Sequence, residues 1–223
     1  MDNQTLHVAS HTHTTIDSNT LMGIHEINVE SYAHVIIILT SVLDAVRTYQ
    51  IKVGHHASVR LCIVVNSVSA QLNFNFELDD YAQVDLKGMY IVKDKQRVDI
   101  ATMQHHKGIA SSSSILLKGI LYDYATADYK GTIIIDDSAP QSQAEQYNKN
   151  LIMSENARAT SIPSLEVLTD NVRCKHGAAV GQLSQDHLLY LQSRGIELEQ
   201  AKSLLIDAFF AEVVNEMHKV SNG

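Results

Sequence analysis

Two side chains near the C-terminus of this sequence have the chemistry to bind a metal. Cys174 and His176 lie one residue apart in the stretch VRCKHGAAVG, and the only other cysteine is Cys62. A thiolate and an imidazole are both good ligands for iron or zinc. If the stretch is a β-strand, alternate residues share a face, so Cys174 and His176 point together. Arg173 and Lys175 point the other way, and we expect their charges to lower the pKa of the thiol.

Two ligands do not complete a metal site, because structural zinc sites and iron–sulfur clusters normally use four. The remaining ligands would come from inorganic sulfide, from carboxylates or from another chain. The alternative is that Cys174 is a half-buried structural residue beside a surface histidine. The residues alone leave both interpretations open.

A second candidate metal site is the pair His11 and His13 near the N-terminus. A His-x-His pair could serve a metal-dependent enzyme of the cupin type, whose barrel binds metal through such a motif. The glycine-led approach and the following glutamate of that motif are missing, and Asp17 is a weak substitute. The segment is polar, which is typical of a solvated tail, so we disfavour the enzyme.

The composition excludes several classes of protein. The net charge is −8 with both signs interspersed, so there is no basic stripe for nucleic acid. The longest apolar run, residues 35–43, is too short to span a bilayer. The N-terminus resembles neither a signal peptide nor a transit peptide. Two distant cysteines form no disulfide framework. We expect a soluble cytoplasmic protein with no nucleic-acid or membrane partner.

Short stretches of alternating apolar and polar residues recur from about residue 51 to residue 177. The clearest is LNFNFEL, residues 72–78, which has the period of a half-buried strand. Starts recur roughly every 12 to 19 residues with no helical pattern between them, which predicts a β-sandwich or a β-solenoid. The other candidate strands begin at Val59, Val84, Val98, Ser114, Gly131, Asn150 and Ser164.

The turn signals favour the solenoid. The chain contains two prolines, and no Asn-Gly or Asp-Gly dipeptide lies between the candidate strands, so tight hairpins are not indicated. Polar stretches such as SSSS (residues 111–114) and DDSA (residues 136–139) suit bends between turns of a coil. We expect a polar, disordered segment over residues 1–30, a β-helix core over 31–180 and a helical domain over 181–223.

The last part of the chain has the period of helices. Ser184 is a good N-cap and Gly195 a good left-handed C-cap for one helix. A longer helix is expected over residues 197–217, and two apolar faces give it two partners, one of which can be a second protein. The alternative is that both faces pack inside one small domain. The first face contains Leu198, Ala201, Leu205, Ala208 and Phe209, and the second contains Ile206, Phe210, Val213 and Met217.

The second half of the chain resembles a known family. The segments are HHKGIASSSSILLKGIL, QYNKNLIMSENARATSIPSLEVLTDNVRCKHGAAVGQL and YLQSRGIELEQAKSLLIDAFFAEVV, in this order. They are similar to the SufB/SufD scaffolds of the SUF system for iron–sulfur cluster assembly. HGAAVG is closer to the SufD form than to the SufB form, which has HEA there. The first hundred residues match loosely, and the usual N-terminal helical region has no counterpart, which indicates a shortened homologue.

The resemblance implies a right-handed parallel β-helix with a C-terminal α-helical domain. In this family B and D subunits pair through their β-helices, and each helical domain docks the ABC-type ATPase SufC. Cys174 and His176 would then lie near the junction with a SufB-like subunit or a second copy, which would supply the missing ligands. The residues that we expect to contact the SufC-like ATPase are Tyr190, Arg194, Gly195, Leu205, Phe209, Phe210 and Val213.

These points predict a non-catalytic scaffold or accessory subunit that holds a transient iron–sulfur cluster shared with its partner. The sequence has no nucleotide-binding motif, so ATP hydrolysis would belong to the partner. Nothing corresponds to the sulfur-accepting cysteine of the B subunit, because Cys62 alternates with Val64 in a core-like context. A solenoid that only dimerises, without a stably bound cofactor, stays open as an alternative.

Overall fold

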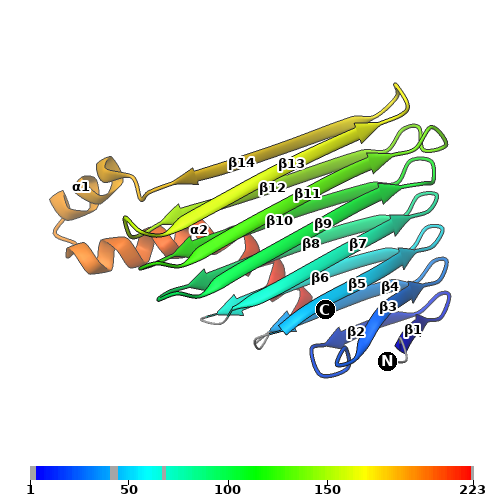
Figure 1. Cartoon of the computed structure of the whole chain (residues 1–223), viewed down its shortest axis with the longest axis horizontal. Helices are drawn as coiled ribbons and strands as arrows, with labels where there is room; N and C mark the ends of the chain where they lie inside the picture. Colours follow the sequence, from blue (N-terminus) through cyan, green and yellow to red (C-terminus); the bar gives the residue numbers. More distant parts are fainter. Residues whose placement is uncertain (1–3, 41–44, 67–68, 222–223) are drawn as a thin grey trace.

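The computed structural model describes residues 4–40, 45–66 and 69–221. Successive strands alternate between two seven-stranded sheets, and neighbouring strands in each sheet run parallel (Figure 1). The chain is therefore a parallel β-solenoid with two C-terminal helices, as the sequence predicts. Sheet A contains β1 (Gln4–Val8), β3 (Ile24–Val29), β5 (Ala45–Val53), β7 (Ala70–Leu78), β9 (Arg97–His106), β11 (Thr126–Ile135) and β13 (Arg158–Val167). Sheet B contains β2 (His13–Asp17), β4 (His34–Thr40), β6 (Ser58–Asn66), β8 (Gln83–Val92), β10 (Ser112–Leu121), β12 (Gln143–Ile152) and β14 (Arg173–Gly181).

The alternation of residue types creates the interior between the sheets. In β7 every second residue is buried, and the same position of each neighbouring strand adds to one column. Tyr49 and Phe74 are register partners whose rings stack with centroids 5.4 Å apart. Column stacking of this kind removes large apolar side chains from water without a hairpin.

The solenoid begins earlier than the sequence indicates. Residues 1–30 were expected to form a disordered tail, but β1, β2 and β3 lie within this range and pair with the strands that follow. These first strands are short, and two of their inward residues, Val8 and Ile16, are buried. The SSSS stretch also differs from expectation, because Ser112 to Ser114 belong to β10 and Ser113 is buried.

One corner of the solenoid has an unusual backbone. His11, Tyr32, His56 and Tyr81 each lie at the bend from sheet A to sheet B and have positive φ angles of 54 to 62°. Their rings form a continuous stack with centroids 4.6 to 5.3 Å apart. Left-handed backbone is costly for residues with a Cβ. Ring stacking offsets part of that cost at these four bends.

The helices match their sequence signals. Helix α1 (Gln185–Ser193) begins after Ser184, whose hydroxyl oxygen accepts a hydrogen bond from the His187 N–H at 3.3 Å. Gly195 follows the helix with a φ of +85°. Helix α2 (Leu198–Ser221) then runs back along sheet B (Figure 1) and contacts β8 and β10. No helix in the described part of the chain is both long enough and apolar enough to cross a bilayer.

Helix α2 covers the outer face of sheet B, and this placement changes the position expected for Cys62. Leu61 and Ile63 belong to the interior core, so Cys62 between them faces outward. Its exposed fraction is nevertheless 1%. The expected alternation is correct and Cys62 is buried, but it lies on the outer face of sheet B instead of inside the solenoid.

Candidate functional site

The two ends of the solenoid differ in how well their inward side chains are covered. At the first turn, Val8 and Ile16 are 6% and 5% exposed. At the last turn, the inward residues Leu165 and Val167 of β13 and Val180 of β14 are 43%, 36% and 50% exposed. The core therefore ends at β13 and β14 in an uncovered apolar surface, which we name the open end. An uncovered apolar surface bounded by two free strand edges is typical of a protein interface.

Cys174 and His176 lie on this open end. Cys174 is the register partner of Ala144 and His176 the register partner of Gln146, and both partners are completely buried. The two side chains therefore share the inward face of β14, as the strand period predicts. Cys174 is half-buried against the small core cluster around Ala144, whereas His176 is exposed. A second molecule at the open end would reach both side chains.

The protonation of Cys174 differs from the sequence-based expectation. Arg173 and Lys175 do point to the outer face, and Lys175 forms an ion pair with Glu145 at 3.1 Å. Burial instead raises the pKa of the Cys174 thiol. The flanking cations fail to lower it because the sheet lies between them and the sulfur. Ligand binding would thus have to displace the thiol proton.

The described residues provide only part of a metal site. Across residues 4–40, 45–66 and 69–221, no group of three or more histidine, cysteine, aspartate or glutamate side chains could hold a metal ion. Cys174 and His176 supply one sulfur and one nitrogen, which are suitable donors for iron. A four-ligand site at this position requires donors from sulfide or from another chain.

The interior behind the open end is polar, although the strand patterns predict an apolar core there. The Nε2 of Gln104 donates to the Oε1 of Gln146 at 3.2 Å, and both side chains are fully buried. The other amide atoms, Gln104 Oε1 and Gln146 Nε2, have no hydrogen-bond partner. Gly131 makes room for this pair, because a Cβ there would lie 2.3 Å from the Gln146 amide. Alternating polar residues in ATMQHH and QYNKN are the signal that could have revealed it.

His106 extends this polar region. Its two ring nitrogens each lie 2.7 Å from a serine hydroxyl, Nδ1 from Ser111 and Nε2 from Ser113. Burial, with a contribution from the neighbouring His105, lowers the pKa of His106 to about 4. The ring is therefore neutral at physiological pH. Two hydroxyls satisfy it without a charge partner.

A third polar group joins β8 to β12 inside the solenoid. The Tyr90 hydroxyl hydrogen-bonds to Asn150, and the Nδ2 of Asn150 donates to Asn148 at 2.8 Å. Burial raises the pKa of Tyr90 to about 12. The last turns thus combine exposed apolar side chains at the end with neutral polar groups behind them.

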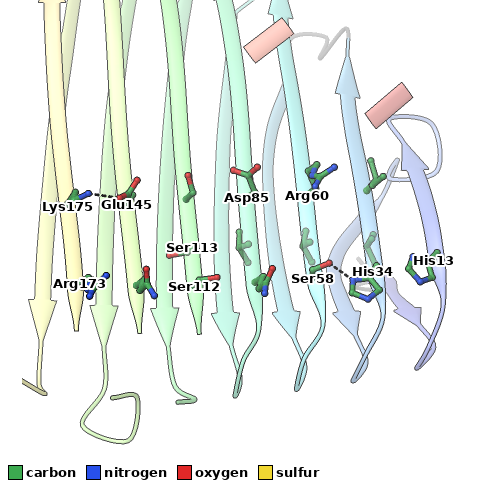
Figure 2. A pocket seen from close by; sticks show the side chains of 17 residues that line it. His13, His34, Ser58, Arg60, Asp85, Ser112, Ser113, Glu145, Arg173 and Lys175 are labelled. Atoms are coloured by element: carbon green, nitrogen blue, oxygen red, sulfur yellow. Dashed lines mark hydrogen bonds and ion pairs between the residues drawn. The ribbon is translucent and has the colours of Figure 1, made fainter. Parts of the chain in front are cut away.

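A groove of about 590 Å³ follows the outer face of sheet B (Figure 2). One ion pair, between Lys175 and Glu145, lies in this groove. A hydrogen bond also lies there, between the Nδ1 of His34 and the Ser58 hydroxyl at 2.6 Å. In-register stacking produces the groove, because successive strands place polar residues at the same two positions. The side chains labelled in Figure 2 are His13, His34, Ser58, Arg60, Asp85, Ser112, Ser113, Glu145, Arg173 and Lys175.

The structure divides the residues expected to contact an ATPase. Phe210 and Val213 are 6% and 0% exposed and pack against this chain itself, so neither can lie on an open docking surface. Leu205 and Phe209 are half-buried. The exposed members are Tyr190, Arg194 and Gly195, and the Arg194 guanidinium lies 5.3 Å from the centroid of the Tyr190 ring. Other exposed apolar side chains on the two helices are Leu189, Leu198 and Leu204.

The pair His11 and His13 does not form a site. His11 stacks on Tyr32 at the corner, whereas His13 stacks on His34 on the outer face of sheet B. The all-parallel sheets also differ from the antiparallel double sheet of a cupin. The cupin interpretation is therefore wrong.

Comparisons with known proteins agree with this geometry. The family model for the SufBD core domain, described as "SUF system FeS cluster assembly", matches residues 2–209. The chain is 37% identical to the iron–sulfur cluster assembly protein SufD of Bacillus subtilis over 133 residues, 60% of this chain and 30% of that protein. It is 35% identical to SufD of Escherichia coli over 115 residues, 52% of this chain and 27% of that protein.

A SufBD family protein of Synechocystis is 40% identical over 102 residues, 46% of this chain and 22% of that protein. The chain thus spans less than half the length of these curated relatives. The family model nevertheless covers the whole described solenoid, α1 and the first half of α2. The chain belongs to the SufBD family of iron–sulfur cluster assembly proteins.

Proposed function

We propose that this chain is a non-catalytic scaffold subunit of a SUF-type complex, and that it contributes Cys174 and His176 to a cluster assembled at a junction between two solenoids. The cluster would be assembled at this junction and then passed on, so it is not a permanent cofactor of the chain. The observation that carries the proposal is the position of both side chains on the open end, amid exposed Leu165, Val167 and Val180. Family membership supports the same assignment.

The partner at the open end would be a SufB-like subunit or a second copy of this chain. Strands β13 and β14 have free edges of ten and nine residues, which can pair with strands of another molecule. Burial of the three apolar side chains would favour this contact. The partner would also supply the ligands that this chain lacks.

The helical domain would dock a SufC-like ATPase. The supporting observation is a set of exposed side chains on both helices, including Tyr190 at 57% and Leu204 at 44% exposure. Because Phe210 and Val213 are buried, the contact would use the other side of α2 together with α1. ATP hydrolysis would take place in the ATPase, and this chain would act in the cytoplasm as its docking platform.

Anaerobic co-expression with a SufC-like ATPase and a SufB-like scaffold tests the cluster site. Iron and sulfide are quantified in the purified complex for wild type and for Cys174→Ala/His176→Ala. The matched control is Arg173→Ala/Lys175→Ala, which changes the alternate residues of the same strand that face away from the open end. We expect iron and sulfide to be lost only in the first variant.

Equal iron and sulfide in both variants would favour the second candidate, a solenoid that only dimerises. That function also relies on the open end but needs no thiol. Docking of the ATPase is tested separately with Tyr190→Ala/Leu204→Asp, which should abolish co-purification. The control is Gln200→Asp, which changes an exposed residue of α2, the helix that contains Leu204. It should leave co-purification unchanged.

A further inference from the structure

Helix α2 closes over a thiol that the solenoid itself leaves outside. Cys62 is on the outer face of β6, on the same side as the exposed Arg60. Only a cover on that face can reduce the exposed fraction of Cys62 to 1%. Helix α2 contacts β8, the neighbour of β6 in sheet B, and the Glu216 carboxylate of the helix contributes to raising the pKa of the Cys62 thiol.

The contact between α2 and sheet B includes a buried charge. Lys118 is on the outer face of β10, and its side chain is 8% exposed. Its Nζ donates to the carbonyl oxygen of Phe209 at 2.8 Å and lies 3.0 Å from the Glu212 carboxylate. The ammonium also lies 5.4 Å from the centroid of the Phe209 ring. Among the described residues, Glu212 supplies the one carboxylate that pairs with it, and that side chain is 56% exposed.

The rest of the contact is apolar and separate from the interior core. Leu116 and Ile120 flank Lys118 on the outer face and are 5% and 0% exposed, but neither belongs to the core cluster between the sheets. Phe210 and Val213 are the buried residues of α2 on this side. The core between the sheets therefore does not depend on α2, and the helix can leave without opening it.

We propose that α2 is a detachable strap over sheet B, that the contact between Lys118 and Glu212 is its latch, and that release of the strap uncovers Cys62. A buried ammonium strongly opposes seating of the helix unless a carboxylate compensates it. Here a single, half-exposed carboxylate does so, and release returns both charges to water. The ion pair between Lys118 and Glu212 thus sets the equilibrium between the bound and the released helix. This inference does not depend on the cluster site or on the identity of the docked ATPase.

The chemistry of Cys62 changes when the strap is released. Burial is the largest cause that raises the pKa of this thiol, and Asp85 and Glu216 raise it further. Arg60 and Lys87 act in the opposite direction. Release ends the burial and removes Glu216, whereas Asp85, Arg60 and Lys87 all stay on the sheet. A larger fraction of Cys62 is then thiolate, the form that reacts with electrophiles.

Alkylation of the full chain with iodoacetamide, followed by peptide mass spectrometry, tests the strap. The chain has two cysteines, so half-exposed Cys174 reports the activity of the reagent while Cys62 reports release. Glu212→Gln should raise the Cys62 rate at least about tenfold, because it leaves Lys118 buried without a carboxylate. The matched control is Glu199→Gln, which removes a carboxylate of α2 that pairs with Lys202 inside the helix.

A double variant separates the latch from a general loss of helix stability. Lys118→Met/Glu212→Gln removes the buried charge together with its partner, so the Cys62 rate should return to within about twofold of wild type. Urea should raise the Cys62 rate with a smaller slope than that of global unfolding, since strap release exposes only the contact between α2 and sheet B. The proposal is overturned if Glu212→Gln behaves like Glu199→Gln, or if Cys62 reacts only with the steep urea dependence of global unfolding.

Discussion

Gly119 and the ring of Tyr90 are in contact inside the solenoid. They are register partners in β10 and β8, and a Cβ at position 119 would lie 2.0 Å from Tyr90 Cε2. The same atom would lie 2.4 Å from the Asn150 amide oxygen that the Tyr90 hydroxyl binds. Glycine at this position therefore makes the hydrogen bond between Tyr90 and Asn150 possible.

Gly119→Ala should destabilise the protein by about 1–3 kcal/mol, because the added methyl group overpacks a buried site. Gly181→Ala is the matched control, since a Cβ at this strand glycine meets nothing within 4 Å. Urea unfolding of both variants measures the difference. An equal free energy of unfolding in the two variants would show that the ring of Tyr90 can move aside.

His106 should make the stability depend on pH. Its pKa is about 4 in the folded protein because burial disfavours the charged ring, against about 6.5 in an unfolded chain. Between these values the unfolded state binds a proton that the folded state does not. Stability is therefore lost as the pH falls from about 6.5 toward 4, by up to about 3 kcal/mol. His106→Gln should flatten this part of the profile in urea titrations, whereas His187→Gln, at an exposed position, should not.

Substitutions of Gln104 and Gln146 should have non-additive effects on the stability of the protein. Changing either residue alone to Met strands the other amide and should cost about 1–3 kcal/mol. The double variant Gln104→Met/Gln146→Met removes both unpartnered atoms while keeping similar volume, so its thermal stability should equal or exceed that of wild type. A double variant as unstable as the sum of the single variants would contradict this account.

The open end should lose its partner when it is charged. Leu165→Glu/Val167→Glu adds two carboxylates to the uncovered surface, and their burial in an interface is costly. Co-purification with a SufB-like scaffold, or sedimentation of the chain alone, should show association weakened at least about tenfold. Val46→Glu, at an exposed apolar position far from this end, serves as the control. Unchanged association in the double variant would move the interface elsewhere.

Much of the fold can be predicted from the alternation of apolar and polar residues in the strands and from the capping residues of the helices. The LNFNFEL alternation, Ser184 and Gly195 all match their structural roles, because these signals act within a few residues. The sequence does not predict the first strands, β1 and β2, because each has only five residues and most of them are polar. Such short strands are stabilised by pairing with a parallel neighbour, which their own composition does not indicate.

The candidate site shows a second limit of the sequence. Strand period places Cys174 and His176 together, but it cannot say whether that face is covered. The same ambiguity applies to Cys62, which faces a helix, and to Phe210, which lies on the covered side of α2. A period identifies residues that share a face. Which face is buried depends on contacts between residues distant in sequence.

The two ends of the solenoid also differ in the length of the strand edges that they present. The edges of β1 and β2 are five residues long, whereas those of β13 and β14 are ten and nine. Short edges are poor templates for further strands. A second molecule that adds strands is therefore favoured at the edges of β13 and β14 over those of β1 and β2.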